Sequence, residues 1–218
     1  MKNILIISLL GITFSNCGVS IYSSLESPDA ATRAAIALEN KDPSGAKAIL
    51  DVALAKGEDP ILRSLRATAW AEVAEVSVVN LAVKMAENQD QSSTDVTALF
   101  PVLPAASKLS ILQKAIDDMG LIGTLKDADQ FKLTMYNTAA FALSLIQYDF
   151  SGDNDLSAAE INSITDFTTI NTYITNATSA AGSYGGGGDS STSAITNLNA
   201  IKTGMGGSLA DLKSFLGS

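Results

Sequence analysis

Apolar residues recur at helical spacing along almost the whole chain, and the alternation typical of strands is nearly absent. Three segments carry an N-cap residue followed by a proline, the signal that opens α-helices: Ser27-Pro28-Asp29, Asp42-Pro43 and Asp59-Pro60. In the first segment we expect Ser27 to be the N-cap and Pro28 to take the first helical position. The three helices are predicted to end near residue 40, at Gly57 and near residue 88. This pattern predicts an all-α fold, either a helical bundle or a short α-solenoid-like array.

The helical pattern continues in the second half of the chain. Further helices are predicted over about 107–119, over about 127–148 and over about 157–180. The Gly- and Ser-rich run 182–192 is expected to be an exposed loop, and 193–218 to form weak helices. We therefore expect an α-helical domain over 27–181, followed by this loop and a C-terminal helical segment.

The first two helices and the start of the third resemble a tetratricopeptide-type unit over residues 29–62. Ala48, Ala55 and Pro60 fall at the offsets where that family has small residues and an opening proline. The aromatic positions of the family's first helix are missing, and the chain has no second copy at the same period. A generic helical hairpin is the alternative interpretation.

The N-terminus has the features of an export signal. Lys2 precedes an apolar run, Ile4–Phe14, which is too short to span a bilayer but fits a signal-peptide core. The run ends in small residues and the single cysteine, Cys17, and so resembles the lipobox of bacterial lipoproteins. Asn16 and Phe14 depart from the usual residues of that motif. An ordinary cleaved signal with an incidental cysteine is the alternative.

The lipobox resemblance implies a location. It implies that 1–16 is a signal peptide, that Cys17 is lipidated, and that 17–26 is a tether to the membrane. Gly18 stands where an aspartate commonly retains such proteins at the inner membrane, so the resemblance implies an outer-membrane lipoprotein of the bacterial cell envelope. Acylation would also remove the liability of a free thiol in an oxidising compartment.

Composition narrows the functional classes. The chain is 46% hydrophobic with a net charge of −9 and a pI near 4.4, which is typical of a globular protein and argues against nucleic-acid binding. There is no histidine and no nucleotide-binding glycine motif. Asp117 and Asp118 could be catalytic carboxylates, but neighbouring acids on a helix are usually a solvated face. Trp70 is expected to lie in the core.

The stretch DFSGDNDLSAAE, residues 149–160, is the most specific motif. Oxygen-bearing residues occupy the ligand positions of an EF-hand calcium loop: Asp149, Ser151, Asp153, Asp155, Ser157 and Glu160. Asn154 replaces the glycine of the tight turn, and Leu156 fills the apolar position. Because apolar helical patterns flank the loop, residues 138–172 resemble a complete EF-hand.

This resemblance implies a bound calcium ion (Ca2+). With no second loop to pair with, the site would be a structural staple that fixes two helices, and its affinity would be low because Ser151 supplies no charge. The alternative is an ion-free acidic turn that is capped by Ser157.

Two functions follow from these expectations. The first is a non-enzymatic outer-membrane lipoprotein with a structural calcium site, which acts as a scaffold for another envelope protein. The alternative is a ligand-binding accessory lipoprotein of a transport system, and a deep apolar cavity would favour it. An enzyme that uses carboxylates alone is a third class, without a motif to support it. The sequence does not determine the oligomeric state.

Overall fold

Helices make up the regular structure of the residues that the computed structural model describes, which are 28–87, 104–153, 156–186 and 189–217. The α-helices are α1 (Ala30–Glu39), α2 (Pro43–Leu54), α3 (Pro60–Val73), α4 (Val78–Glu87), α6 (Leu109–Gly120), α7 (Asp127–Ile146), α8 (Ala158–Ser163), α9 (Phe167–Ser183), α10 (Asp189–Gly204) and α11 (Leu209–Leu216). A short 3-10 helix, Ala106–Lys108, precedes α6. The described residues contain no strand, so the all-α prediction is confirmed.

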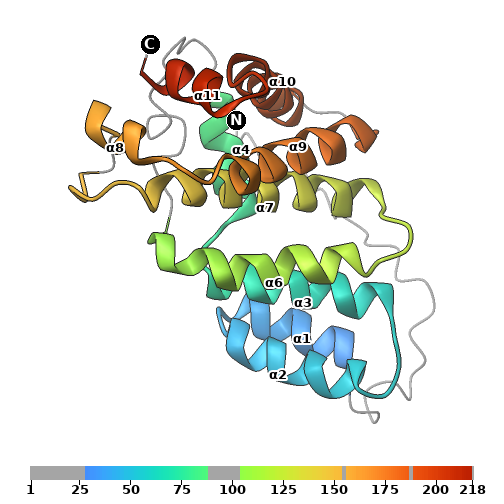
Figure 1. Ribbon diagram of the computed structural model, residues 1–218. Coiled ribbons are helices and arrows are strands. Elements are labelled where there is room, and N and C mark those ends of the chain that lie inside the picture. Colours follow the sequence, from blue (N-terminus) through green and yellow to red (C-terminus); the bar gives the residue numbers. More distant parts are fainter. Residues whose placement is uncertain (1–27, 88–103, 154–155, 187–188, 218) are drawn as a thin grey trace, which may run out of the picture.

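The helices stack in layers from one end of the molecule to the other (Figure 1). The α1–α2 hairpin packs on α3, α3 packs on α6, and α6 packs on α7. Beyond α7 lie α9 and then α10 and α11, with α4 packed against both α10 and α7. We call α1–α3 and α6 the N-terminal half, and α4 with α7–α11 the C-terminal half.

The Asp-Pro signals place two helix starts correctly. Asp42 and Asp59 are N-caps, each with a proline in the first turn. Their side chains accept hydrogen bonds from backbone N–H groups of α2 and α3. The first start was placed wrongly, because Asp29 is the N-cap of α1 and accepts the Thr32 amide at 2.7 Å. Proline thus precedes this cap instead of following it, and Ser27 lies outside the described residues.

The α1–α2 hairpin shares a small core with α3: Ala34, Leu38, Ala46, Leu50 and, from α3, Ala69. Ala48 and Ala55, on which the tetratricopeptide resemblance rests, are exposed. The close approach of these helices therefore uses other alanines than those at the family offsets.

Two of the predicted helices are each divided in two. The third ends at Val73, because Glu75 takes a left-handed conformation (φ 65°) and the next amide, of Val76, bonds back to Ala71 O at 2.9 Å. The helix predicted over 157–180 is broken between α8 and α9, where Asp166 caps the new helix by accepting the Thr169 amide. Neither break carries a glycine or proline, the residues that usually signal one.

Helix α7 is the central element. Every residue from Thr134 to Leu145 is buried. Its buried threonine and serine hydroxyls bond carbonyls of their own helix, as in Thr138 to Thr134 O (2.8 Å) and Ser144 to Phe141 O (2.6 Å). The helix can therefore pack on α6 on one side and on α9 and α4 on others.

The C-terminal segment packs on the body of the protein. Helix α10 begins at Asp189, inside the run that was expected to be a loop, and α9 extends to Ser183. Leu198, Met205 and Leu212 belong to the main core, and Asn197 Nδ2 of α10 donates to Met85 O of α4 at 2.6 Å. Gly204 lies against the ring of Phe215, so a side chain at this position would collide with α11.

Candidate functional site

The acidic loop is closed by Glu160. This side chain is 6% exposed, and its carboxylate accepts the amides of Phe150 (2.8 Å), Ser151 (2.9 Å) and Ser157 (2.9 Å), together with the Ser157 hydroxyl (2.7 Å). Hydrogen bonds from the Ser157 side chain, and then from these amides, lower the pKa of Glu160 to about 2. The predicted cap is confirmed: Ser157 and Glu160 form a capping box at the start of α8.

The other predicted ligands are only partly brought together. Asp149 Oδ1 accepts the Ser151 hydroxyl (2.9 Å) and the Gly152 amide (2.7 Å), and Gly152 takes φ 74°. Asp153 is exposed. Asp155, and Asn154 of the predicted tight turn, lie outside the described residues.

The Glu160 carboxylate is engaged within the loop. Both Glu160 oxygens are directed to donors of the loop itself, and the described residues hold no group of three or more acidic, histidine or cysteine side chains placed to bind a metal. Calcium at 149–160 therefore remains a prediction, as does lipidation of Cys17, which lies outside the described part of the chain.

A pocket of about 730 Å³ lies between the two halves. It is lined from α3 by Thr68, Ala71 and Glu72, and from α7 by Ala128, Phe131, Lys132 and Tyr136. These residues recur at helical spacing, so each helix presents one face to the pocket. Val76 and Ser77 between α3 and α4, Val78 and Val79 at the start of α4, and Tyr184 after α9 also line it. A mostly apolar wall with a few polar groups in this size range is typical of small-molecule sites.

Tyr136 is the unusual residue of this wall. It is fully buried, and its hydroxyl has no hydrogen-bond partner among the described residues. Burial raises the pKa of the phenol, which the nearby Thr68 side chain opposes only in part. The Thr68 hydroxyl itself donates to Ser64 O at 3.0 Å, and it makes no well-formed hydrogen bond to Tyr136. The Tyr136 side chain lines the pocket but its hydroxyl oxygen is closed to solvent, so a ligand atom can reach it only when neighbouring side chains of the wall shift.

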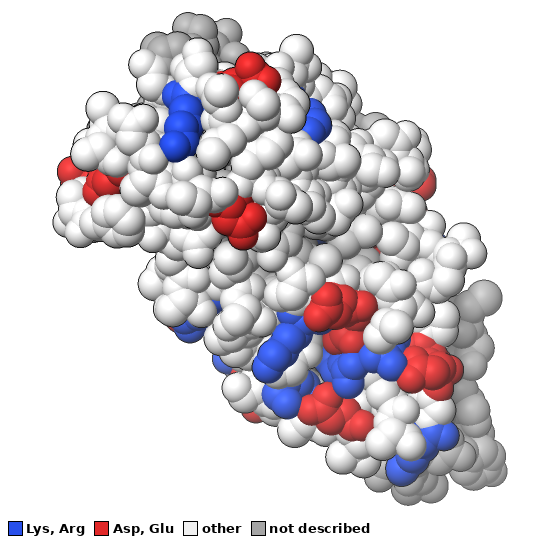
Figure 2. All heavy atoms as spheres, viewed as in Figure 1, with Lys and Arg blue, Asp and Glu red and all other residues white. Residues whose placement is uncertain are grey.

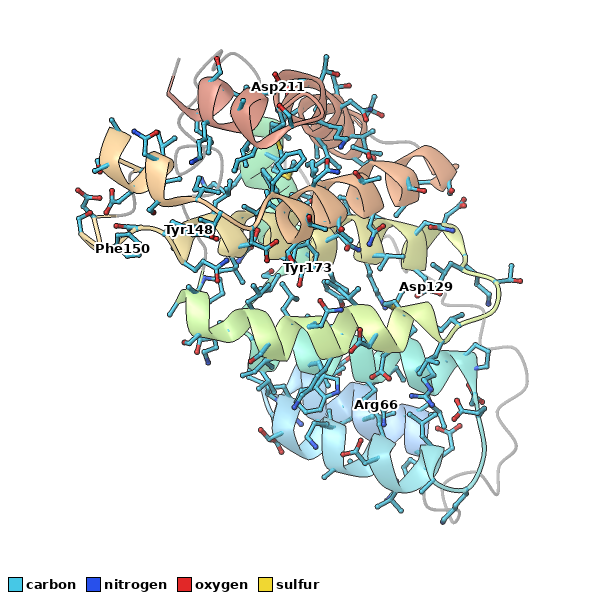
Figure 3. All side chains as sticks on the ribbon, viewed as in Figure 1. Arg66, Asp129, Tyr148, Phe150, Tyr173 and Asp211 are labelled. Carbon is cyan, nitrogen blue, oxygen red and sulfur yellow. The ribbon has the colours of Figure 1, made fainter. Side chains whose placement is uncertain are left out.

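Lys132 lies one turn before Tyr136 on the same face of α7. Its Nζ donates to Ser64 Oγ at 2.9 Å and is 3.8 Å from Asp129 Oδ1. Burial lowers the pKa of Lys132, and Asp129 opposes this shift by favouring the ammonium form. Figure 3 labels Asp129 near the start of α7 and Phe150 beyond the opposite end of that helix, so the pocket and the acidic loop are well separated.

Ser64 links Lys132 to Asp129. The Ser64 hydroxyl donates its proton to Asp129 Oδ1 at 2.5 Å, so the lysine does not act as its base. Ser64 is 7% exposed and is not part of the pocket wall. Ser64 and Asp129 thus hold the Lys132 amine in place.

Two strained backbone positions lie at the pocket. Lys41 (φ 60°) and Glu75 (φ 65°) are the described non-glycine residues with positive φ, and both line it. Each follows a helix and occupies the position where glycine is usual. Strain retained at a pocket is a common feature of functional sites.

A charged cluster in the N-terminal half has a structural role. Asp118 is 3% exposed and accepts hydrogen bonds from Arg63 Nη1 (2.9 Å) and Arg66 Nε (2.7 Å), which joins α3 to α6. The expectation of a solvated acid pair was thus wrong for Asp118, because the arginines of another helix cover it. Trp70 is only half-buried, with Lys47 and Lys114 over its ring at 4.8 and 4.5 Å from the centroid.

The sequence analysis did not identify Lys132, Tyr136 or Glu72. One signal was present: Lys132 is the only charged residue between Gln130 and Tyr148, a stretch that is otherwise suited to a core helix. No protein-family model, curated protein or solved structure matches the chain. Among the residues that the structure describes, no helix is long and apolar enough to cross a membrane.

Proposed function

We propose that this protein is a non-enzymatic ligand-binding module of the cell envelope, held at the outer membrane through lipidated Cys17, whose pocket takes a largely apolar small molecule. The observation that carries the proposal is the buried Tyr136 hydroxyl, which lacks a protein partner on the wall of a 730 Å³ pocket. A cavity of this kind favours the ligand-binding expectation over the scaffold expectation.

The test is to fill the pocket. Ala128 is exposed and lines the pocket, so Ala128→Trp should block the pocket with little cost to folding. Ala200, an exposed residue of α10 outside the pocket, provides the matched control Ala200→Trp. The soluble chain, residues 18–218, is titrated with N-phenyl-1-naphthylamine, a neutral apolar dye whose fluorescence rises in apolar sites.

We expect saturable binding to the wild type and to Ala200→Trp, and loss of binding in Ala128→Trp. Absence of saturable binding in the wild type, or equal binding to both variants, would overturn the proposal. If the expected binding is found, displacement of the dye by extracts of the envelope provides a route to the natural ligand.

The scaffold function with a calcium staple is a second candidate. Its support is that Asp149 and Glu160, the first and last positions of the loop, both bond amides near the loop entrance, so the loop is already closed. Calorimetric titration with calcium, beside Asp149→Ala and Glu160→Gln, tests it. One bound ion that both variants lose, with a higher melting temperature in calcium, is the expected result. Absence of binding heat at millimolar calcium would refute the calcium site, and Glu160 would then close the loop through its hydrogen bonds alone.

A further inference from the structure

We infer that the ligand presents an oxygen acceptor, a carboxylate or an amide carbonyl, to Lys132 and Tyr136, with an apolar body along the rest of the pocket. This inference rests on the proposed function and adds the chemical class of the ligand. It follows from which hydrogen-bonding groups on the wall remain available.

Tyr136 offers a donor. Because burial raises the pKa of its phenol, the hydroxyl keeps its proton at neutral pH. The coulombic influence of Glu72, a half-buried residue of the facing wall, acts in the same direction. A buried hydroxyl that holds its proton and has no acceptor in the described structure calls for an acceptor atom from the ligand.

Lys132 offers further donors beside it. An ammonium group has three N–H donors, and the described residues provide one hydrogen-bond acceptor, Ser64 Oγ. The Asp129 carboxylate, at 3.8 Å, is near enough to attract the charge but too far for a normal hydrogen bond. Since Lys132 and Tyr136 are four residues apart on one helix, both can reach the same group of a ligand.

The remaining wall determines the body of the ligand. Phe131 and Tyr184 pack with ring centroids 5.4 Å apart, and Ala71, Val76 and Val78 continue the apolar surface. The rim is different in character, because Lys41, Glu75 and Asp127 are exposed there. The apolar inner wall therefore fits an apolar chain or ring, and Lys132 and Tyr136 fit a single oxygen-bearing end.

The experiment compares molecules with one tail and different head groups. Decanoate, decanamide and decylammonium compete with N-phenyl-1-naphthylamine on the wild type, on Tyr136→Phe and on Tyr173→Phe. Tyr173 is the matched control, because its hydroxyl already donates to Gln113 Oε1 at 2.7 Å and lies outside the pocket wall.

We expect decanoate or decanamide to bind the wild type about tenfold more tightly than decylammonium, the effect of one buried hydrogen bond. Tyr136→Phe should weaken this preference without abolishing it, because Lys132 still favours an oxygen acceptor over an ammonium group, and it should keep dye binding. It should also raise the unfolding midpoint, since it deletes an unsatisfied group. Tyr173→Phe should keep the preference and lower the midpoint. Tightest binding of decylammonium, or an unchanged preference in Tyr136→Phe, would overturn the inference. Loss of dye binding by the wild type would instead refute the proposed function.

Discussion

The two halves of the molecule are stabilised in different ways. In the N-terminal half, charged side chains gather on one face (Figure 2), and Arg63 and Arg66 bond carboxylates of neighbouring helices. In the C-terminal half, Lys202 donates to Asn171 Oδ1 and Lys213 to Asn162 O, which are neutral oxygens. There, apolar burial around α7 provides the stability. The pocket lies between these two halves, and its mostly apolar wall carries the partly buried Lys132 and Glu72.

Removal of a core side chain from α7 should have the largest effect. Phe141 is fully buried, so Phe141→Ala is expected to lower the free energy of unfolding by about 3–5 kcal/mol. Phe150, which is 71% exposed, is the matched control, and Phe150→Ala should change it by less than about 0.5 kcal/mol. Urea unfolding measures both. Similar losses in the two variants would contradict the burial assigned to α7.

The ion cluster should give a smaller and salt-dependent effect. Asp118→Ala leaves two arginines without their buried partner and is expected to cost about 2–3 kcal/mol, below the cost for a fully buried pair because Arg66 retains 19% exposure. Its exposed neighbour gives the control Asp117→Ala, with a loss below about 0.5 kcal/mol. In high salt the penalty of Asp118→Ala should shrink and that of Phe141→Ala should not. Equal salt responses would remove the contrast between the halves.

The stabilising effect of Glu160 should depend on pH. Its pKa is lowered from 4.5 to about 2 on folding, so its contribution to stability is fully present above pH 4.5 and is lost as the pH falls toward 2. Glu160→Gln should therefore unfold more easily than the wild type at neutral pH, and the difference should vanish near pH 2. Thermal melts across this range measure the effect. A difference that persists undiminished at low pH would show that the carboxylate charge is not the cause.

The strained helix ends should give the smallest effect, and with the opposite sign. Lys41→Gly and Glu75→Gly relieve a left-handed residue and are each expected to raise the free energy of unfolding by about 0.5–1 kcal/mol. Gly152→Ala, at φ 74°, is the reverse control and should lower it. Urea unfolding measures these changes. A loss of stability in the glycine variants would contradict the prediction, and it would mean that the Lys41 and Glu75 side chains stabilise the fold by more than the backbone strain destabilises it.

Local signals account for most of the fold that the sequence predicted. Asp42-Pro43, Asp59-Pro60 and Ser157 fix helix starts through contacts within a few residues, so they can be recognised without tertiary information. The break at Glu75 has no such signal, because a charged residue takes the place of glycine. Tyr136 could not be distinguished from a core residue either, since its lack of a partner depends on how α3 stands opposite α7.

The position of α4 affects both truncation of the protein and its folding during translation. In sequence it lies between α3 and α6 of one half, yet it packs on α10 and α7 of the other. Truncation between α6 and α7 would therefore strip Leu81, Ala82 and Met85 of their cover, and neither fragment would be an autonomous folding unit. During synthesis α4 leaves the ribosome long before α10 exists. The part of its apolar face that α10 covers stays uncovered until α10 has been translated, whereas α7 can cover another part earlier.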